Sequence, residues 1–173
     1  MVAALTLILG GAASGKSAHA EDLVTATGLA RVYLATAEPY DAEMHEKIEF
    51  HRQRRGPDWR TVEAPRDLRP ALEAVAADEV VLLDCATMWL SNHLLAESDL
   101  SQAEADLIDA LTHCAAPVVV VSNEVGLSVV PDNALARRFQ TAQGRLNQTL
   151  AARADVVVNV IAGLPQILKG HRP

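Results

Sequence analysis

Residues 5–17 read Leu5-Thr6-Leu7-Ile8-Leu9-Gly10-Gly11-Ala12-Ala13-Ser14-Gly15-Lys16-Ser17, an apolar run that leads directly into a glycine-rich loop. A glycine, four residues and Gly-Lys-Ser form the P-loop pattern, whose backbone N–H groups surround phosphate oxygens at the start of a helix. We expect Lys16 to reach the β- and γ-phosphates of a nucleotide and Ser17 to ligate Mg²⁺. The alternative is a glycine-rich turn that only caps a helix. The strand before the loop and the helix-compatible residues 18–24 favour the P-loop.

The composition predicts one α/β domain with an aliphatic core. The chain has 173 residues, of which 50% are hydrophobic and only 3% aromatic, which suits a mostly parallel sheet with helices on both faces. The net charge of −7 and the single short arginine cluster argue against nucleic-acid binding. The two cysteines lack zinc-type spacing and indicate a reducing compartment. The first apolar run is too short for a signal peptide or membrane span, so we expect a cytoplasmic protein.

A second strand is predicted at residues 31–36, after the P-loop helix. Strand, helix and strand at this spacing form a βαβ unit. Ligands of open parallel sheets lie beyond the carboxyl ends of the strands, so Ala35, Thr36 and Ala37 are expected to border the nucleotide. From spacing alone, an ordinary loop at these three residues is an equally good interpretation.

A helix is predicted from Asp41 to about Arg55, closed by Gly56-Pro57. Met44 and Ile48 lie four residues apart on its apolar side, and His51 is the next position on that side. Spacing alone is explained by a half-buried histidine followed by a solvated basic helix end. A chemical role for His51 is the competing interpretation.

The run Glu79-Val80-Val81-Leu82-Leu83-Asp84 predicts a buried strand that ends in a carboxylate. An aspartate at such a strand end is typical of the Walker-B arrangement, in which it holds Mg²⁺ or its water opposite the P-loop serine. Many buried strands end in aspartate, so the P-loop in the same chain is what supports this role for Asp84. Cys85 is most simply a small core or site-wall residue.

The remaining elements are predicted from apolar periodicity. A short alternating segment covers residues 59–63, and buried strands cover 117–122 and 155–161. Helices are predicted at 67–77, at 87–96, and at 101–115 with a capping box of Ser101 and Glu104. A long helix is predicted to start at Asp132, with an apolar stripe of Leu135, Phe139, Ala142, Leu146 and Leu150. Its solvated side is expected to carry Arg137, Arg138, Arg145 and Asn147.

Over nearly its whole length the chain resembles the bifunctional adenosylcobinamide kinases and adenosylcobinamide-phosphate guanylyltransferases of cobalamin assembly. The resemblance is carried by an ordered set of motifs that is far more specific than the P-loop alone. They are the P-loop, Ala35-Thr36, Asp41-Ala42-Glu43-Met44 with Ile48 and His51, Trp59-Arg60-Thr61-Val62-Glu63, Leu83-Asp84-Cys85, Asn92, Ser122-Asn123-Glu124-Val125-Gly126, Val130-Pro131 and Gly144-Arg145-Leu146-Asn147-Gln148.

The resemblance implies a RecA-like fold, a trimer and two reactions. In the first, ATP or GTP phosphorylates the aminopropanol hydroxyl of adenosylcobinamide. In the second, His51 takes GMP from GTP and passes it to adenosylcobinamide phosphate. Some relatives have two adjacent histidines where this chain has Phe50-His51, and the second corresponds to His51. The resemblance assigns nucleotide contacts to the P-loop and to Arg52, Gln53, Arg54, Arg55, Glu63 and Asp84.

Two other functions remain open at this point. One is a P-loop small-molecule kinase without the guanylyl step, in which His51 is structural. The other is a RecA-like nucleotide-dependent binding module. The sequence has no Asn-Lys-x-Asp motif of a GTPase switch, and its acidic charge and few aromatic residues disfavour a nucleic-acid motor.

Overall fold

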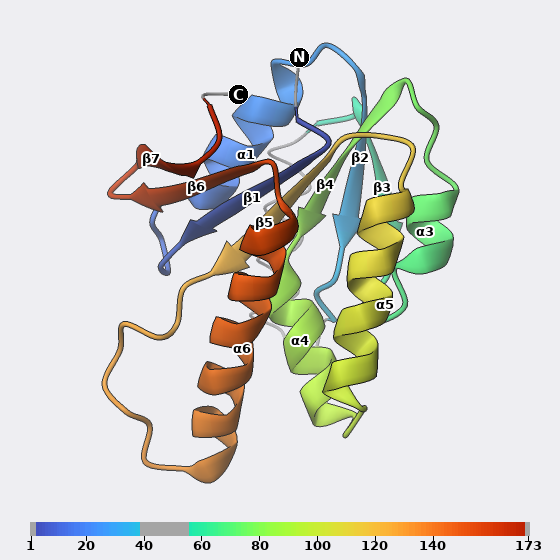
Figure 1. Ribbon diagram of the computed structural model, residues 1–173. Coiled ribbons are helices and arrows are strands. Elements are labelled where there is room, and N and C mark those ends of the chain that lie inside the picture. Colours follow the sequence, from blue (N-terminus) through green and yellow to red (C-terminus); the bar gives the residue numbers. More distant parts are fainter. Residues whose placement is uncertain (1–2, 39–55, 172–173) are drawn as a thin grey trace.

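A seven-stranded sheet forms the centre of the computed structural model, which describes residues 3–38 and 56–171 (Figure 1). The strand order is β3-β2-β4-β5-β1-β6-β7. Neighbouring strands are parallel except for the antiparallel pair β6 and β7. The predicted α/β fold with a mostly parallel sheet is therefore confirmed. The strands are β1 Leu5–Gly10, β2 Ala30–Ala35, β3 Trp59–Glu63, β4 Glu79–Asp84, β5 Val118–Asn123, β6 Val156–Ile161 and β7 Leu164–Lys169.

Helices cover both faces of the sheet. Helix α1 (Lys16–Thr25) packs on one face, where Ala20 and Val24 join a core that includes Ile8 of β1. The opposite face carries α3 (Arg69–Glu73), α4 (Ala86–Leu95), α5 (Leu100–His113) and α6 (Ala134–Arg153), whose core includes Leu7 of the same strand. Because successive side chains of a strand point to opposite faces, β1 contributes to both cores and is apolar throughout. The helix predicted for residues 41–55 lies outside the described residues.

Two predicted helix starts are wrong by one or two residues because another side chain is the cap. The Asp99 carboxylate accepts hydrogen bonds from the N–H groups of Ser101 (3.0 Å) and Gln102 (3.2 Å). Ser101 therefore lies inside α5, and the predicted capping box does not form. Asn133 caps α6 by accepting a 2.8 Å bond from the N–H of Ala136, so Asp132 precedes the cap.

The helix predicted for residues 67–77 is also wrong in extent, because only Arg69–Glu73 is helical. The chain turns toward β4 directly after this element. The Glu79 carboxylate accepts a 2.8 Å bond from the N–H of Ala76 and thereby fixes that turn.

Helix α6 buries more polar surface than its pattern predicts. Leu146 and Leu150 are buried, but Leu135, the first residue of the predicted stripe, is 52% exposed. Asn147 was predicted on the solvated side, yet it is only 6% exposed, and the neighbouring Gln143 is buried. The Asn147 carbonyl oxygen accepts bonds from the Ser122 hydroxyl (2.6 Å) and the Gln143 amide (2.9 Å). These bonds offset the cost of burying the amide.

Strand β7 was not predicted. Its six residues are all exposed, so it lacks the alternation that marks a half-buried strand. Pro165 further weakens the signal, because proline is confined to edge strands. The turn before it is formed by Ala162 and Gly163, which both have positive φ (52° and 78°), as in a tight two-residue hairpin.

The cap of α5 gives a matched test of the corrected helix start. Asp99→Ala should lower the free energy of unfolding by about 1 kcal/mol, because two N–H groups lose their acceptor. Ser101→Ala should change it by less than about 0.5 kcal/mol, because this exposed side chain does not cap the helix. Urea denaturation of both variants measures the difference. An equal loss in the two variants would restore Ser101 as the cap.

Candidate functional site

The P-loop leaves the carboxyl end of β1 through a position with no room for a side chain. A Cβ atom on Gly10 would lie 2.7 Å from the Val160 carbonyl oxygen and would collide with the Ser14 hydroxyl. The N–H of Gly163 in the β6–β7 turn donates a 2.8 Å bond to the carbonyl of Ser14 and holds the far side of the loop. The loop is thus enclosed between β1 and the turn that follows β6.

The start of α1 directs backbone N–H donors toward this loop. Its N-cap, Gly15, has a φ of 92° and has no side chain with which to cap the helix, and the first turn contains no acidic residue. Lys16 bends over the loop, with Nζ 3.1 Å from the Gly11 carbonyl oxygen. The Ser14 hydroxyl is buried without a hydrogen-bond partner in the described part of the chain. Backbone amides, a helix dipole and a lysine make this concavity suited to a phosphate.

Asp84 is the last residue of β4, which lies two strands away from the P-loop strand β1. Because only β5 separates β4 from β1, the two strands are about 10 Å apart. Oδ2 of Asp84 accepts a 3.0 Å bond from the Tyr33 hydroxyl, which orients the carboxylate. The Ser17 hydroxyl and the Asp84 carboxylate are hard oxygen donors, which fit Mg²⁺ when substrate phosphates complete its coordination.

Thr36 joins the ends of β2 and β4. It is fully buried, and its hydroxyl donates to the Cys85 carbonyl (2.7 Å) while accepting from the Cys85 N–H (2.8 Å). The side-chain amide of Asn92 donates a 2.8 Å bond to the Thr36 carbonyl. The Thr36 side chain is therefore engaged in holding this edge. That it, Ala35 and Ala37 border a nucleotide remains a prediction.

Cys85 is a buried residue at the carboxyl end of β4, and its thiol is unreactive. Burial and, to a smaller extent, the neighbouring Asp84 carboxylate together raise the pKa of its thiol to about 12, against the opposing effects of backbone hydrogen bonds from Met88 and Thr87 and of the Lys16 charge. The thiol therefore stays protonated at neutral pH and is a poor nucleophile.

The predicted site residues fall into two groups along the carboxyl edge: those of the P-loop after β1, and those at the ends of β2, β3 and β4. In the strand register, Ala35 pairs with both Asp84 and Glu63, which places these three in one row. Four strand spacings separate β3 from β1, so Glu63 lies about 19 Å from the P-loop strand. Glu63 and Lys16 are too far apart to contact the same phosphate group.

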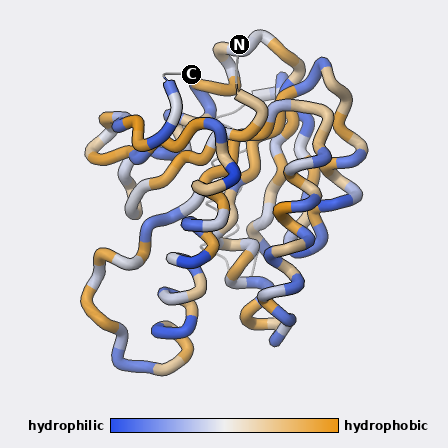
Figure 2. Tube along the Cα trace, in the orientation of Figure 1, coloured by the Kyte–Doolittle hydropathy of each residue, from blue (hydrophilic) through white to orange (hydrophobic). Residues whose placement is uncertain are grey.

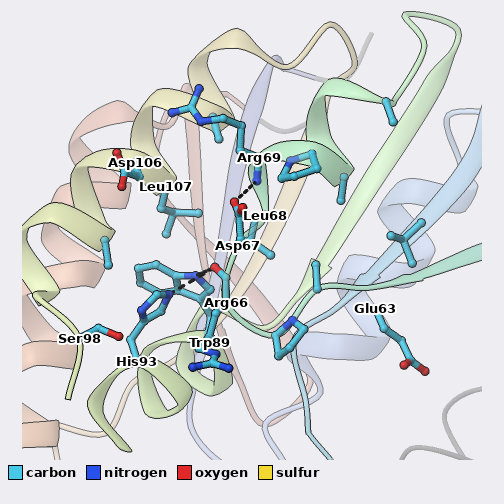
Figure 3. A pocket seen from close by; sticks show the side chains of 18 of the residues that line it. Glu63, Arg66, Asp67, Leu68, Arg69, Trp89, His93, Ser98, Asp106 and Leu107 are labelled. Atoms are coloured by element: carbon cyan, nitrogen blue, oxygen red, sulfur yellow. Dashed lines mark hydrogen bonds between the residues drawn. The ribbon is translucent and has the colours of Figure 1, made fainter. Parts of the chain in front are cut away.

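A cavity of about 880 Å³ lies beside Glu63, between the segment after β3 and helices α3, α4 and α5 (Figure 3). Of the described residues predicted for the site, Glu63 alone lines it. Trp89 Nε1 donates a 2.8 Å bond to the Arg66 carbonyl, and the His93 ring lies 4.6 Å from the Trp89 ring. The cavity is thus a separate feature from the phosphate-binding loop.

The predicted nucleophile and its basic neighbours, His51, Arg52, Gln53, Arg54 and Arg55, lie outside the described residues. Two residues that shape the edge were missed by sequence reasoning. Tyr33 was only a strand residue in the pattern, and its bond to Asp84 spans 51 positions. Gly163 had a local signal, because Ala162-Gly163 separates two apolar runs, but its contact with the P-loop is non-local.

No helix in the described ranges, 3–38 and 56–171, is both long enough and apolar enough to cross a membrane.

Comparison with solved structures shows a shared fold at low sequence identity. The flagellar accessory protein FlaH from Methanocaldococcus jannaschii matches with a TM-score of 0.56 and 13% identity, covering 99% of this chain and 80% of that chain. The RadB recombinase matches with a TM-score of 0.50 and 18% identity, covering 91% and 75%. These neighbours support the RecA-like P-loop architecture.

Sequence comparisons find relatives with much higher identity to this chain. The bifunctional adenosylcobalamin biosynthesis protein CobP of Pseudomonas aeruginosa is 44% identical over 168 residues, covering 95% of this chain and 97% of the relative. The corresponding CobU protein of Escherichia coli is 40% identical over 176 residues, covering 92% and 97%. Residues 6–168 match the family model described as cobinamide kinase / cobinamide phosphate guanyltransferase. With this match over most of the chain, the protein belongs to the cobinamide kinase / cobinamide phosphate guanyltransferase family.

Proposed function

We propose that this chain phosphorylates adenosylcobinamide with ATP or GTP and then transfers GMP from GTP to adenosylcobinamide phosphate. The observation that carries the proposal is the uncapped start of α1 beneath Lys16, with the Asp84 carboxylate two strands away. Membership of the family supports the same pair of reactions. The proposal includes a single catalytic domain over residues 1–173 in a cytoplasmic protein. It also includes a homo-oligomer, for which the family resemblance implies a trimer, and no nucleic-acid partner.

In the kinase step, the P-loop amides and Lys16 would hold the β- and γ-phosphates. The acceptor oxygen attacks the γ-phosphorus, and the bond from that phosphorus to the β,γ-bridging oxygen breaks, so that the nucleoside diphosphate leaves. Ser17 and Asp84 would hold Mg²⁺, which when bound neutralises charge on the phosphate oxygens. The protein's main contribution is position and charge, since phosphoryl transfer to a hydroxyl requires no protein nucleophile.

In the guanylyl step, a neutral nitrogen of His51 would attack the α-phosphorus of GTP and expel pyrophosphate. A phosphate oxygen of adenosylcobinamide phosphate then attacks the same phosphorus and releases the imidazole. Arg52, Arg54 and Arg55 would offset the charge that develops on the α-phosphate, and Gln53 and Glu63 would contact the nucleotide. Because about 19 Å separates β3 from β1, Glu63 would contact a part of the nucleotide other than the phosphates held by Lys16.

Lys16→Ala should lower kcat/KM for the kinase reaction by roughly 100-fold or more, because the phosphates lose a positive charge that the backbone cannot replace. Nucleotide affinity should fall as well. Coupled ADP-release kinetics and equilibrium nucleotide binding measure the two effects. Unchanged turnover and affinity would remove the basis for assigning a phosphate site to this loop.

Asp84→Asn should lower kinase activity by roughly 100-fold or more while the fold persists, because the amide has the same shape but no charge for Mg²⁺. Circular dichroism checks the fold, and activity is measured across a range of Mg²⁺ concentrations. Tyr33→Phe is a comparison variant that removes the 3.0 Å bond from the Tyr33 hydroxyl to Asp84 and keeps the Asp84 charge, so it should cost much less. An Asp84→Asn variant with normal Mg²⁺ dependence would leave Asp84 a purely structural role.

His51→Ala should abolish labelling of the protein by α-³²P-GTP and guanylyl transfer, while kinase activity is retained. The wild-type label should be acid-labile and base-stable, as expected of a phosphoramidate. Both reactions are assayed on the same purified protein, with thermal melting as the control for folding. Labelling that survives the substitution would move the nucleophile elsewhere, first to His45. Loss of both activities in a folded variant would contradict the division of labour between His51 and the P-loop.

A further inference from the structure

The segment between β5 and α6, residues 124–133, exposes three large aliphatic side chains, and we call this segment the arm. Leu127 and Val129 are each 91% exposed and Val130 is 73% exposed. In Figure 2 the arm is the loop at the lower left, where apolar positions lie far from the cores of the sheet. Single exposed apolar residues are ordinary, but a group of three on one projecting segment indicates a binding surface.

The arm is tied to α6 by hydrogen bonds from two side chains. The Gln140 amide donates to the Val125 carbonyl (3.1 Å) and to the Ser128 hydroxyl (3.2 Å). Nη1 of Arg137 donates to the carbonyls of Pro131 (2.9 Å) and Asp132 (2.8 Å). These bonds restrain the two ends of the arm and Ser128 between them, which lowers the entropy cost of binding a ligand there.

The arm begins directly beside the phosphate-binding loop. Gly10 and Asn123 are paired in the register of β1 and β5, and the Glu124 N–H donates a 3.0 Å bond to the Gly10 carbonyl. In Figure 1 the arm continues from the carboxyl end of β5 past the end of β1. A molecule held by the base of the arm is therefore next to a nucleotide held by the P-loop.

We propose that the arm binds the corrinoid acceptor of the kinase reaction, an inference that rests on the proposed function above. A nucleoside triphosphate offers polar phosphates and sugar to this edge, whereas a corrinoid is a broad macrocycle with methyl-bearing faces and amide side chains. Leu127, Val129 and Val130 suit those faces. The arm starts at Glu124, which is hydrogen-bonded to Gly10, so the aminopropanol side chain of a macrocycle on the arm would extend back toward the γ-phosphate.

The size of the surface favours a small-molecule occupant over a second copy of the chain. A stable protein interface buries about 800 Å² on each partner. At the usual free energy per unit of buried apolar area and per buried Leu or Val side chain, the three exposed side chains offer roughly 200–350 Å² of apolar surface, which is less than that area. A macrocycle needs only a few such contacts when the phosphate-binding loop fixes the other reactant.

The test compares a double variant, Leu127→Ser with Val129→Ser, against Leu168→Ser. Leu168 is also exposed (55%), but it lies at the end of β7 remote from the turn that contacts the P-loop, next to Lys169, which pairs with Val157 and donates to the carbonyls of Ala151 and Ala152. We expect the double variant to raise the KM for cobinamide at least tenfold and leave the KM for nucleotide within twofold, because only apolar acceptor contacts are lost. The Leu168→Ser variant should match wild type in both constants.

Two further measurements decide among the other outcomes. Sedimentation should give the same mass for wild type and the double variant; a smaller mass would assign the arm to an interface between copies and overturn the inference. Equilibrium dialysis of cobinamide with the full chain measures binding without turnover and should show at least tenfold weaker affinity in the double variant. Equal affinity would overturn the inference even with an active wild type, whereas wild type that binds cobinamide without phosphorylating it contradicts the proposed kinase function alone.

Discussion

The arrangement of this protein depends on the close approach of backbone at the carboxyl end of β1. Gly10 lies against the Val160 carbonyl and the Ser14 hydroxyl, so the strand can turn into the P-loop only without a side chain there. This approach is possible because β1 lies between β5 and β6 and is hydrogen-bonded to both. The same central position places the end of β5, with Asn123, beside the loop, and the end of β4, with Asp84, one strand further away. The phosphate site is thus a product of sheet order as much as of the glycine-rich motif.

Sequence reasoning was most successful where a pattern is local and repeated. The apolar runs of β1, β4, β5 and β6 and the P-loop context were sufficient to predict the sheet and the place of Asp84. Sequence reasoning failed where a single polar contact determines where a helix begins or which side chain is buried. Asp99 caps α5 through two short-range bonds that competed with an equally plausible Ser101, and Asn147 is buried because Ser122 and Gln143 satisfy it. Periodicity cannot rank such alternatives, because it carries no information about distant partners.

The candidate site likewise combines residues that a local pattern predicts with residues that it does not. The glycine-rich loop and its place between β1 and α1 were predictable, since its residues are consecutive, while its contacts with a nucleotide stay a prediction. Tyr33 and Gly163 act through contacts with residues 51 and 149 positions away, and nothing in their local sequence identifies those partners. The distance between Glu63 and the P-loop is likewise a property of strand order. A linear list of motifs suggests one compact site, whereas the fold distributes them along an edge.

The bond from Gly163 to Ser14 gives the outermost hairpin a thermodynamic connection to the nucleotide site. Strand β7 is exposed along its length and pairs in the sheet with β6, while Lys169 at its end also donates to the carbonyls of Ala151 and Ala152. Local opening is therefore expected to start at the end of β7 that follows the turn. The first residues of β7 follow the turn that closes the P-loop, so opening this hairpin frees the loop on one side. A ligand that requires the closed loop must then slow amide hydrogen exchange in β7, a strand that it does not touch. Hydrogen exchange in β7, at the edge of the sheet, would thus report whether a ligand is bound at the P-loop beside the central strand β1.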